Sequence, residues 1–186
     1  MGFGSPLYLK KTINMACALT TGFSLDCKDA IGGIKSVRFA SLSDYESLTP
    51  AYATGAVTFG APSATFYKYE LDKEESSFSD DPTPGSNKGT LYYVPAVTFI
   101  LSKLDVAKRN EMQLLAKNRV VAIIETREAT PQYWAIGVTN GLDLSTGVAG
   151  SGVAAADLNG FTMTFMGLEP NPMVSVSSTD LTSITN

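Results

Sequence analysis

The sequence predicts a mainly β protein of the α+β class, a β-sandwich or barrel flanked by one α-helix, with a long β-hairpin and extended terminal arms. Apolar residues make up 44% and charged residues only 17% of the 186 residues. Thr, Ser, Gly, Val and aromatic residues are plentiful, and they favour strands and turns. Only one stretch has a clear helical period. The length suits one domain with its own core, so residues 1–186 are expected to form a single domain.

The chain before the first strand shows no clear period. Residues 1–29 are therefore expected to form an N-terminal arm that reaches a neighbouring molecule. After the turn signal Gly32-Gly33, residues 34–40 alternate, with Val37 and Phe39 on one face, which indicates a half-buried strand. Residues 41–50 are expected to form a loop.

A long hairpin is predicted next. Residues 57–59 suggest a brief strand and residues 64–71 a firmer one. Residues 72–89 contain acids, serines, prolines and glycines, a composition typical of a loop or a disordered segment. Residues 90–101 resume as a strand that pairs with 64–71 around this mobile tip. Because Pro95 cannot donate to a ladder, it favours an edge or a bulge there.

The one predicted helix begins at Asp105, a good N-cap, and ends near Asn118. Its apolar residues fall in one broad arc, which Lys108 and Glu111 interrupt, so the helix is expected to lie on a sheet surface. The arc contains Leu104, Ala107, Met112, Leu114 and Leu115.

Residues 119–127 contain a nearly continuous apolar run, which predicts a central strand covered on both faces. Residues 132–138 should pair with it across a short turn. A small-residue loop is expected over 147–156, and residues 161–166 alternate as a half-buried strand. The Ser/Thr-rich residues 171–186 are expected to form a C-terminal arm that becomes ordered in an assembly.

Enzyme chemistry finds little support in the sequence. The chain has no histidine, which removes the commonest general base and the commonest metal ligand. The run from Gly147 to Gly152 lacks the Lys and Ser/Thr of a phosphate-binding loop. Glu70 and Glu125 sit on predicted strands, but nothing in the sequence pairs them for glycosidase chemistry, and such carboxylates are usually surface charge. A small hydrolase is therefore the weakest hypothesis.

No cofactor or metal is predicted. Cys17 and Cys27 lack the paired spacing of a zinc site and are expected to be reduced, partly buried thiols. An acidic cluster could bind a divalent cation, but it lacks EF-hand spacing, so a solvated loop is favoured. Its members are Asp72, Glu74, Glu75, Asp80 and Asp81.

A group of tyrosines in the predicted hairpin could form a stacking platform for sugars or bases. Cross-strand aromatic packing explains it with fewer assumptions. The residues are Tyr67, Tyr69, Tyr92 and Tyr93.

The charge pattern argues against nucleic-acid binding. The formal net charge is −4, and residues 68–81 account for all of it. The rest of the chain has no excess of basic residues that could bind nucleic-acid phosphates. The N-terminus makes a poor signal peptide, and no apolar window is long enough to span a membrane. An intracellular protein without membrane contact is expected.

Several motifs resemble a family of virion structural proteins encoded by phages and prophages of Bacteroidetes-type hosts, often taken to be tail tube subunits or related ring proteins. The resemblance begins at Met15, so residues 1–14 are an extension, and it includes the predicted hairpin. The motifs are MACALTTGFSLDCKDAIGGIK (15–35), KLDVAKRNE (103–111), NRVVAIIETR (118–127), YWAIGVTNGL (133–142) and AADLNGFTMTF (155–165).

The resemblance implies a non-enzymatic virion subunit, assembled in the host bacterial cytoplasm, that joins copies of itself edge to edge into rings. Stacked rings would form a tail tube through which DNA passes without specific binding, in contact with other phage tail or neck proteins. The hairpin tyrosines are expected to touch the next subunit, and Glu74, Glu75, Asp80 and Asp81 to repel DNA from the lumen or to lie in the loop. The alternatives are a neck-ring, connector or tail-terminator protein that forms a single ring and, from another class, a β-sandwich glycan-binding module.

Overall fold

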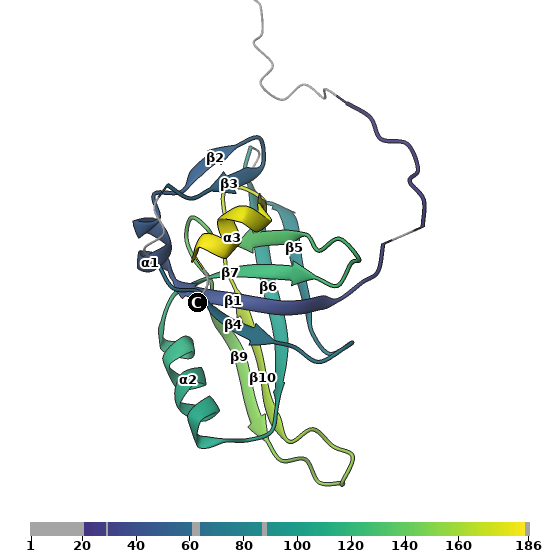
Figure 1. Ribbon diagram of the computed structural model, residues 1–186, viewed down its shortest axis with the longest axis vertical. Coiled ribbons are helices and arrows are strands. Elements are labelled where there is room, and N and C mark those ends of the chain that lie inside the picture. Colours follow the sequence, from purple (N-terminus) through teal and green to yellow (C-terminus); the bar gives the residue numbers. More distant parts are fainter. Residues whose placement is uncertain (1–20, 29, 61–63, 87–88, 185–186) are drawn as a thin grey trace, which may run out of the picture.

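The computed structural model describes residues 21–28, 30–60, 64–86 and 89–184 (Figure 1). It is mainly β, with two sheets and three helices within these residues. The elements are β1 (Ile34–Ser41), α1 (Leu42–Ser47), β2 (Ala51–Ala53), β3 (Ala56–Thr58), β4 (Tyr67–Glu70), β5 (Ser77–Pro84), β6 (Leu91–Ser102), α2 (Val106–Lys117), β7 (Val120–Thr126), β8 (Tyr133–Ile136), β9 (Asp143–Gly150), β10 (Gly160–Met166), β11 (Val174–Val176) and α3 (Ser178–Ile184).

The strands form a seven-stranded sheet in the order β2-β3-β11-β8-β7-β1-β4 and a four-stranded sheet in the order β5-β6-β10-β9. All pairings are antiparallel except that of β11 with β3. The main core lies between the two sheets and α2. Its centre is aromatic: the ring centroid of Phe39 lies 5.4 Å from that of Phe99 and 5.5 Å from that of Phe165. This arrangement confirms the predicted β-rich α+β fold.

A second core covers the other face of the seven-stranded sheet. Tyr45 of α1, Leu48 directly after it and Leu181 of α3 pack there with Val121 and Ile123 of β7. The strand β7 is consequently buried on both faces along its whole length. This confirms the prediction of a central strand and explains its continuous apolar run.

The helix and three further strands also match their predictions. Asp105 Oδ2 accepts a hydrogen bond from the Ala107 N–H at 3.2 Å, which caps α2. Met112 and Leu115 are the buried residues of this helix, whereas Leu114 is 56% exposed. Strand β8 pairs with β7, and β1 and β10 form where alternation predicted them. Strand β1 differs in one respect, because its second face, with Ser36 and Arg38, is buried too.

The predicted hairpin is wrong in its pairing. Strand β4 joins β1 at the edge of the seven-stranded sheet, whereas the partner of β6 is β5, within the segment 72–89 that was predicted to be a loop. An edge strand tolerates prolines. The two prolines of β5 follow an alternation over residues 77–81 in which Phe78 and Asp80 are the less exposed residues. The alternation of residues 64–71 predicted a strand but did not specify its partner.

Strand β6 is also not an edge, although it contains Pro95. It lies between β5 and β10, and the regular pairing with β10 ends at Ala96, beside the proline that has no N–H to donate. The Pro95 carbonyl still accepts a hydrogen bond from the Gly167 N–H at 3.0 Å.

Three predicted irregular segments are partly regular. Residues 42–47 form α1, and the first part of the predicted loop 147–156 belongs to β9. The predicted C-terminal arm, residues 171–186, contains β11 and α3, which contribute Val174, Val176 and Leu181 to the second core. For α1, β11 and α3, tertiary burial stabilises a short segment whose own sequence signal is weak. Strand β9 is mostly exposed and is held by its pairing with β10.

Candidate assembly surfaces

The structure separates the four predicted contact tyrosines into two sheets. Tyr67 and Tyr69 lie on β4, and Tyr92 and Tyr93 lie on β6, opposite Thr83 and Pro82 of β5. They therefore form no common stacking platform, and the tyrosine argument for a glycan-binding module fails. Only Tyr67, which is 59% exposed, is largely open to solvent.

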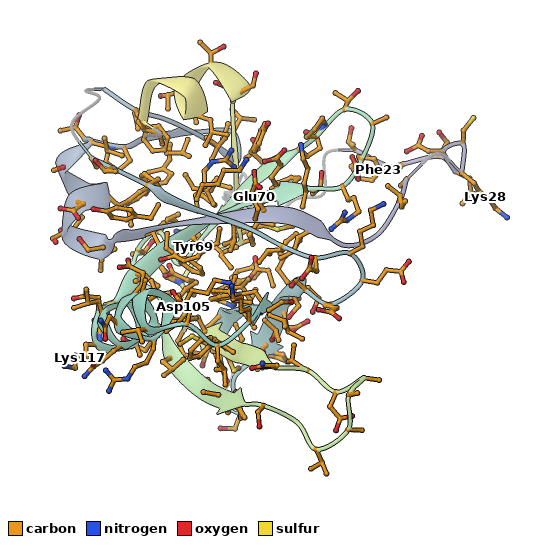
Figure 2. All side chains as sticks on the ribbon, turned by 60° about the horizontal axis from the view of Figure 1, so that its bottom comes forward. Phe23, Lys28, Tyr69, Glu70, Asp105 and Lys117 are labelled. Carbon is orange, nitrogen blue, oxygen red and sulfur yellow. The ribbon has the colours of Figure 1, made fainter. Side chains whose placement is uncertain are left out.

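Tyr69 has a structural role, visible where it is labelled beside β4 (Figure 2). Its ring packs edge-on against Phe39 at 5.7 Å between centroids, and its hydroxyl donates to Glu111 Oε1 of α2 at 3.4 Å. Burial, followed by the Glu111 charge, raises the pKa of Tyr69 above its ordinary value. This residue joins the helix to the sheet edge.

The four predicted lumen acids also divide into two groups. Glu74 and Glu75 are exposed in the turn before β5, and Glu74 adopts a positive φ of 65°. Asp80 and Asp81 lie on β5 and point in different directions. Asp80 Oδ2 accepts a hydrogen bond from the Met173 N–H at 2.6 Å, which ties β5 to the segment before β11. Asp81 accepts one from Ser79 Oγ at 3.1 Å on the exposed side of the strand.

The outer face of the four-stranded sheet is almost uncharged and rich in hydroxyl groups. The side chains of Val97, Phe99 and Met163 point into the main core, so their neighbours along each strand point outward. Thr98 and Thr164 face each other across β6 and β10, and their hydroxyl oxygens are 3.0 Å apart. By this alternation the outward set on β5, β6 and β10 is Ser77, Ser79, Asp81, Thr83, Tyr92, Val94, Ala96, Thr98, Ile100, Ser102, Thr162, Thr164 and Met166. Asp143 of β9 lies opposite Met166, so Asp81 and Asp143 are the charged residues of this face.

The two edges of this sheet differ. Strand β5 carries two acids and two prolines, which weaken its capacity to pair with another strand. Strand β9 carries no proline, and Asp143 at its start is its only charged residue; most of its side chains are exposed, including Val148 at 66%. An open, small-residue edge of this length offers unpaired backbone groups to a further strand.

A buried carboxylate fixes the turn that precedes β9. Glu169 is 3% exposed, and its Oε1 atom accepts hydrogen bonds from the backbone N–H groups of Thr139, Asn140 and Gly141 at 3.3, 2.8 and 3.2 Å. Its own backbone pairs with Tyr93 of β6. The residue thus connects β6 to the turn that leads into β9. Glu169 was not predicted as a structural residue, because no local sequence pattern distinguishes a glutamate that binds a turn 28 residues away.

Glu169→Gln is expected to lower the free energy of unfolding by about 1.5 to 3 kcal/mol, because an amide replaces the charged acceptor of several buried hydrogen bonds. Urea denaturation followed by circular dichroism measures this change. Asp157→Asn is the matched control, since Asp157 Oδ2 also accepts two backbone N–H bonds, at 2.8 and 2.7 Å, but in the exposed loop after β9. An equal loss in both variants would contradict a special role for Glu169.

A buried ionic cluster lies between β1 and β7. Glu125 receives hydrogen bonds from Lys35 Nζ at 2.7 Å, Ser36 Oγ at 2.7 Å and Arg38 Nη1 at 3.3 Å. The Arg38 guanidinium also lies 5.8 Å from the centre of the Tyr133 ring. Glu125 was expected at the surface but is 3% exposed, whereas Glu70 is exposed as expected and pairs with Lys68 at 3.0 Å.

Cation and redox sites receive no support from the described residues. Within them, no group of three or more carboxylate, histidine or cysteine residues is placed to hold a metal ion. Cys27 is an exposed free thiol, in contrast to the partial burial expected, and Cys17 lies outside the described residues. No helix in the described part of the chain is long and apolar enough to cross a membrane.

An open cavity of about 500 Å³ lies beside the start of β9. Its polar wall is formed by Arg119 and Asp143, whose Nε and Oδ1 atoms are 3.4 Å apart in an exposed ion pair. Its apolar wall includes Val94, Met166 and Leu168. This mixed surface adjoins the open sheet edge and extends the area available for contact with another molecule.

Comparison with known proteins found no protein-family model, curated protein or solved structure that matches this chain.

Proposed function

We propose that this protein is a structural subunit of a bacteriophage virion, a tail tube protein that assembles into stacked rings around a DNA channel. The observation that carries the proposal is the four-stranded sheet, which has two open edges and an outer face rich in hydroxyl groups. Strand β9 of one subunit would lie against the next subunit, and a repeated head-to-tail contact of this kind closes into a ring.

The charge of the outer face suits a DNA channel. Joined sheets would turn their threonine- and serine-rich faces toward one lumen. Each subunit would contribute Asp81 and Asp143 as charged groups, with Arg119 paired to Asp143 beside Val94 and Met166. A face whose charged groups are carboxylates, with its neighbouring arginine paired to one of them, gives the phosphates of a duplex little to bind tightly. DNA could then move through the channel without specific contacts.

A single substitution tests the edge contact. Val148→Lys is expected to abolish rings and tubes, because a charge in the middle of β9 opposes strand addition. Val148 is 66% exposed, so the subunit itself should fold normally. Leu114→Lys on α2 is the matched control, since Leu114 is 56% exposed but lies outside the sheet. Negative-stain electron microscopy and sedimentation velocity report assembly.

Wild-type protein that stays strictly monomeric at high concentration, together with virions that contain no ring or tube of this chain, would overturn the proposal. Assembly of Val148→Lys like that of wild type would overturn the β9 contact. Rings that never stack, at one ring per virion, would favour a neck-ring, connector or tail-terminator protein instead.

A further inference from the structure

A small pocket lies where strands β1 and β4 meet the helices α1 and α2. We call it the α1–α2 pocket, and its volume is about 120 Å³. Sites that bury a drug-sized ligand have volumes of roughly 300 to 1,000 Å³. The α1–α2 pocket is therefore of a size to take one small chemical group.

The sheet register brings the walls of the pocket together. Ser41 at the end of β1 pairs with Val120 at the start of β7. The first turn of α1, which follows β1, therefore lies beside the last turn of α2, which precedes β7. On the other side of β1, Phe39 pairs with Tyr67 of β4. The floor is apolar, because Phe39, Leu115 and Val120 are buried there.

The wall of the pocket carries negative charge and an excess of hydrogen-bond acceptors. Asp44 of α1 and Glu111 of α2 both line it, and neither carboxylate belongs to an ion pair within the described residues. Asn118 donates its side-chain N–H to the Leu114 carbonyl at 3.1 Å, which leaves its Oδ1 atom as a further acceptor. No lysine or arginine among the described residues lines the pocket. This wall suits a ligand that carries positive charge and several N–H donors.

Two tyrosines form another part of the wall. Tyr69, labelled in Figure 2, donates from β4 to Glu111 of α2, and Tyr67 lies two residues before it on the same face of β4. The face of an aromatic ring attracts a cation that lies within about 6 Å of its centre. Tyr67 is 59% and Leu114 is 56% exposed, so the outer part of the wall is apolar and suits the alkyl stem of a charged group.

We propose that the α1–α2 pocket binds a small organic cation, a guanidinium or primary ammonium group on an alkyl stem. The charged group donates hydrogen bonds to the carboxylates of Asp44 and Glu111, and the stem leaves the pocket past Tyr67 and Leu114. A metal ion fits less well, because no group of three or more metal-binding side chains is placed together within the described residues. No residue of the four-stranded sheet lines the pocket, so its ligand does not depend on the proposed assembly.

Saturation-transfer NMR with n-butylguanidinium as the probe tests the site. The signals of the ligand are observed, so the measurement works for a monomer and for a tube alike. Saturable binding with a Kd of about 1 mM is expected for a ligand of this size. n-Butylurea has nearly the same shape without the charge and should bind at least about tenfold more weakly. Absence of saturable transfer from n-butylguanidinium, or equal binding of the two ligands, would overturn the proposal.

Substitutions place the ligand in this pocket. Asp44→Asn and Glu111→Gln are each expected to raise the Kd of n-butylguanidinium by about tenfold, and Tyr67→Leu, which keeps an apolar wall, by about threefold. Glu46→Gln is the matched control, because it removes the same charge from an exposed position of α1 outside the pocket. Its Kd should change by less than about twofold. An equal effect of Asp44→Asn and Glu46→Gln would mean attraction by net charge alone and would contradict the site.

A second ligand identifies the source of the cation. Nα-Acetyl-arginine amide carries the same charged group on a peptide backbone. Binding of this compound more tightly than n-butylguanidinium would support the site and assign the cation to an arginine side chain of another protein. Equal or weaker binding would support the site and assign the cation to a free amine or guanidine.

Discussion

Phe99→Ala is expected to lower the free energy of unfolding by about 3 to 5 kcal/mol, the range for removal of a fully buried aromatic side chain. Phe99 is 0% exposed and stacks on Phe165 at 6.2 Å between ring centroids with an angle of 8° between the rings. It also contacts Phe39 of the other sheet, so its loss leaves a cavity where the two sheets meet. Thermal and urea denaturation measure the change.

Tyr67→Ala is the matched control for this substitution. This substitution also removes an aromatic ring from a strand, but the Tyr67 side chain is 59% exposed. The free energy of unfolding is therefore expected to change by no more than about 0.5 kcal/mol. Comparable losses in the two variants would contradict a core centred on Phe99. Phe99 packs between the two sheets. Loss of fixed packing between the sheets in Phe99→Ala would appear as a broadened unfolding transition.

Glu125→Gln is expected to destabilise the protein by about 3 to 5 kcal/mol, because it leaves Arg38 buried without its carboxylate partner. The Arg38 side chain is only 9% exposed. The double variant Arg38→Met and Glu125→Leu should recover much of the loss, since removal of both charges leaves no unpaired ion. Glu70→Gln is the control: it breaks the Lys68–Glu70 pair, whose carboxylate is 82% exposed, and should cost less than about 1 kcal/mol.

Glu125 also makes the stability of the protein depend on pH in the acidic range. Burial alone would raise the pKa of Glu125, but the hydrogen bonds from Lys35 and Ser36 and the charges of Lys35 and Arg38 lower it below its usual 4.5. A carboxylate with a lowered pKa in the folded state stabilises that state above its unfolded pKa, and this contribution is lost as the pH falls toward the folded value. Unfolding free energies measured below pH 5 should therefore fall less steeply for Glu125→Gln than for wild type. Parallel slopes would contradict the ion-pair assignment.

The candidate assembly surface could be predicted from the sequence only in part. Tyrosines were expected at the subunit contact and acids at the lumen or in a loop, but Asp80 points to Met173 while Asp81 faces outward. That distinction depends on the strand assignment of residues 77–84, which two prolines concealed. The open edge of β9 was missed for a similar reason, because its small residues are equally typical of a loop.

The sequence by itself determined the β-rich class, the helix capped by Asp105, and the strands whose alternation or apolar run is strong, such as β7 and β10. Those features depend on residues within one element, where period and capping act locally. The tertiary structure decided which strands pair: β4 was predicted to be the partner of β6, but β5 pairs with it. It also decided that Glu125 and Glu169 are buried. Both outcomes depend on side chains that lie far apart in the chain and meet only when the two sheets close around their common core.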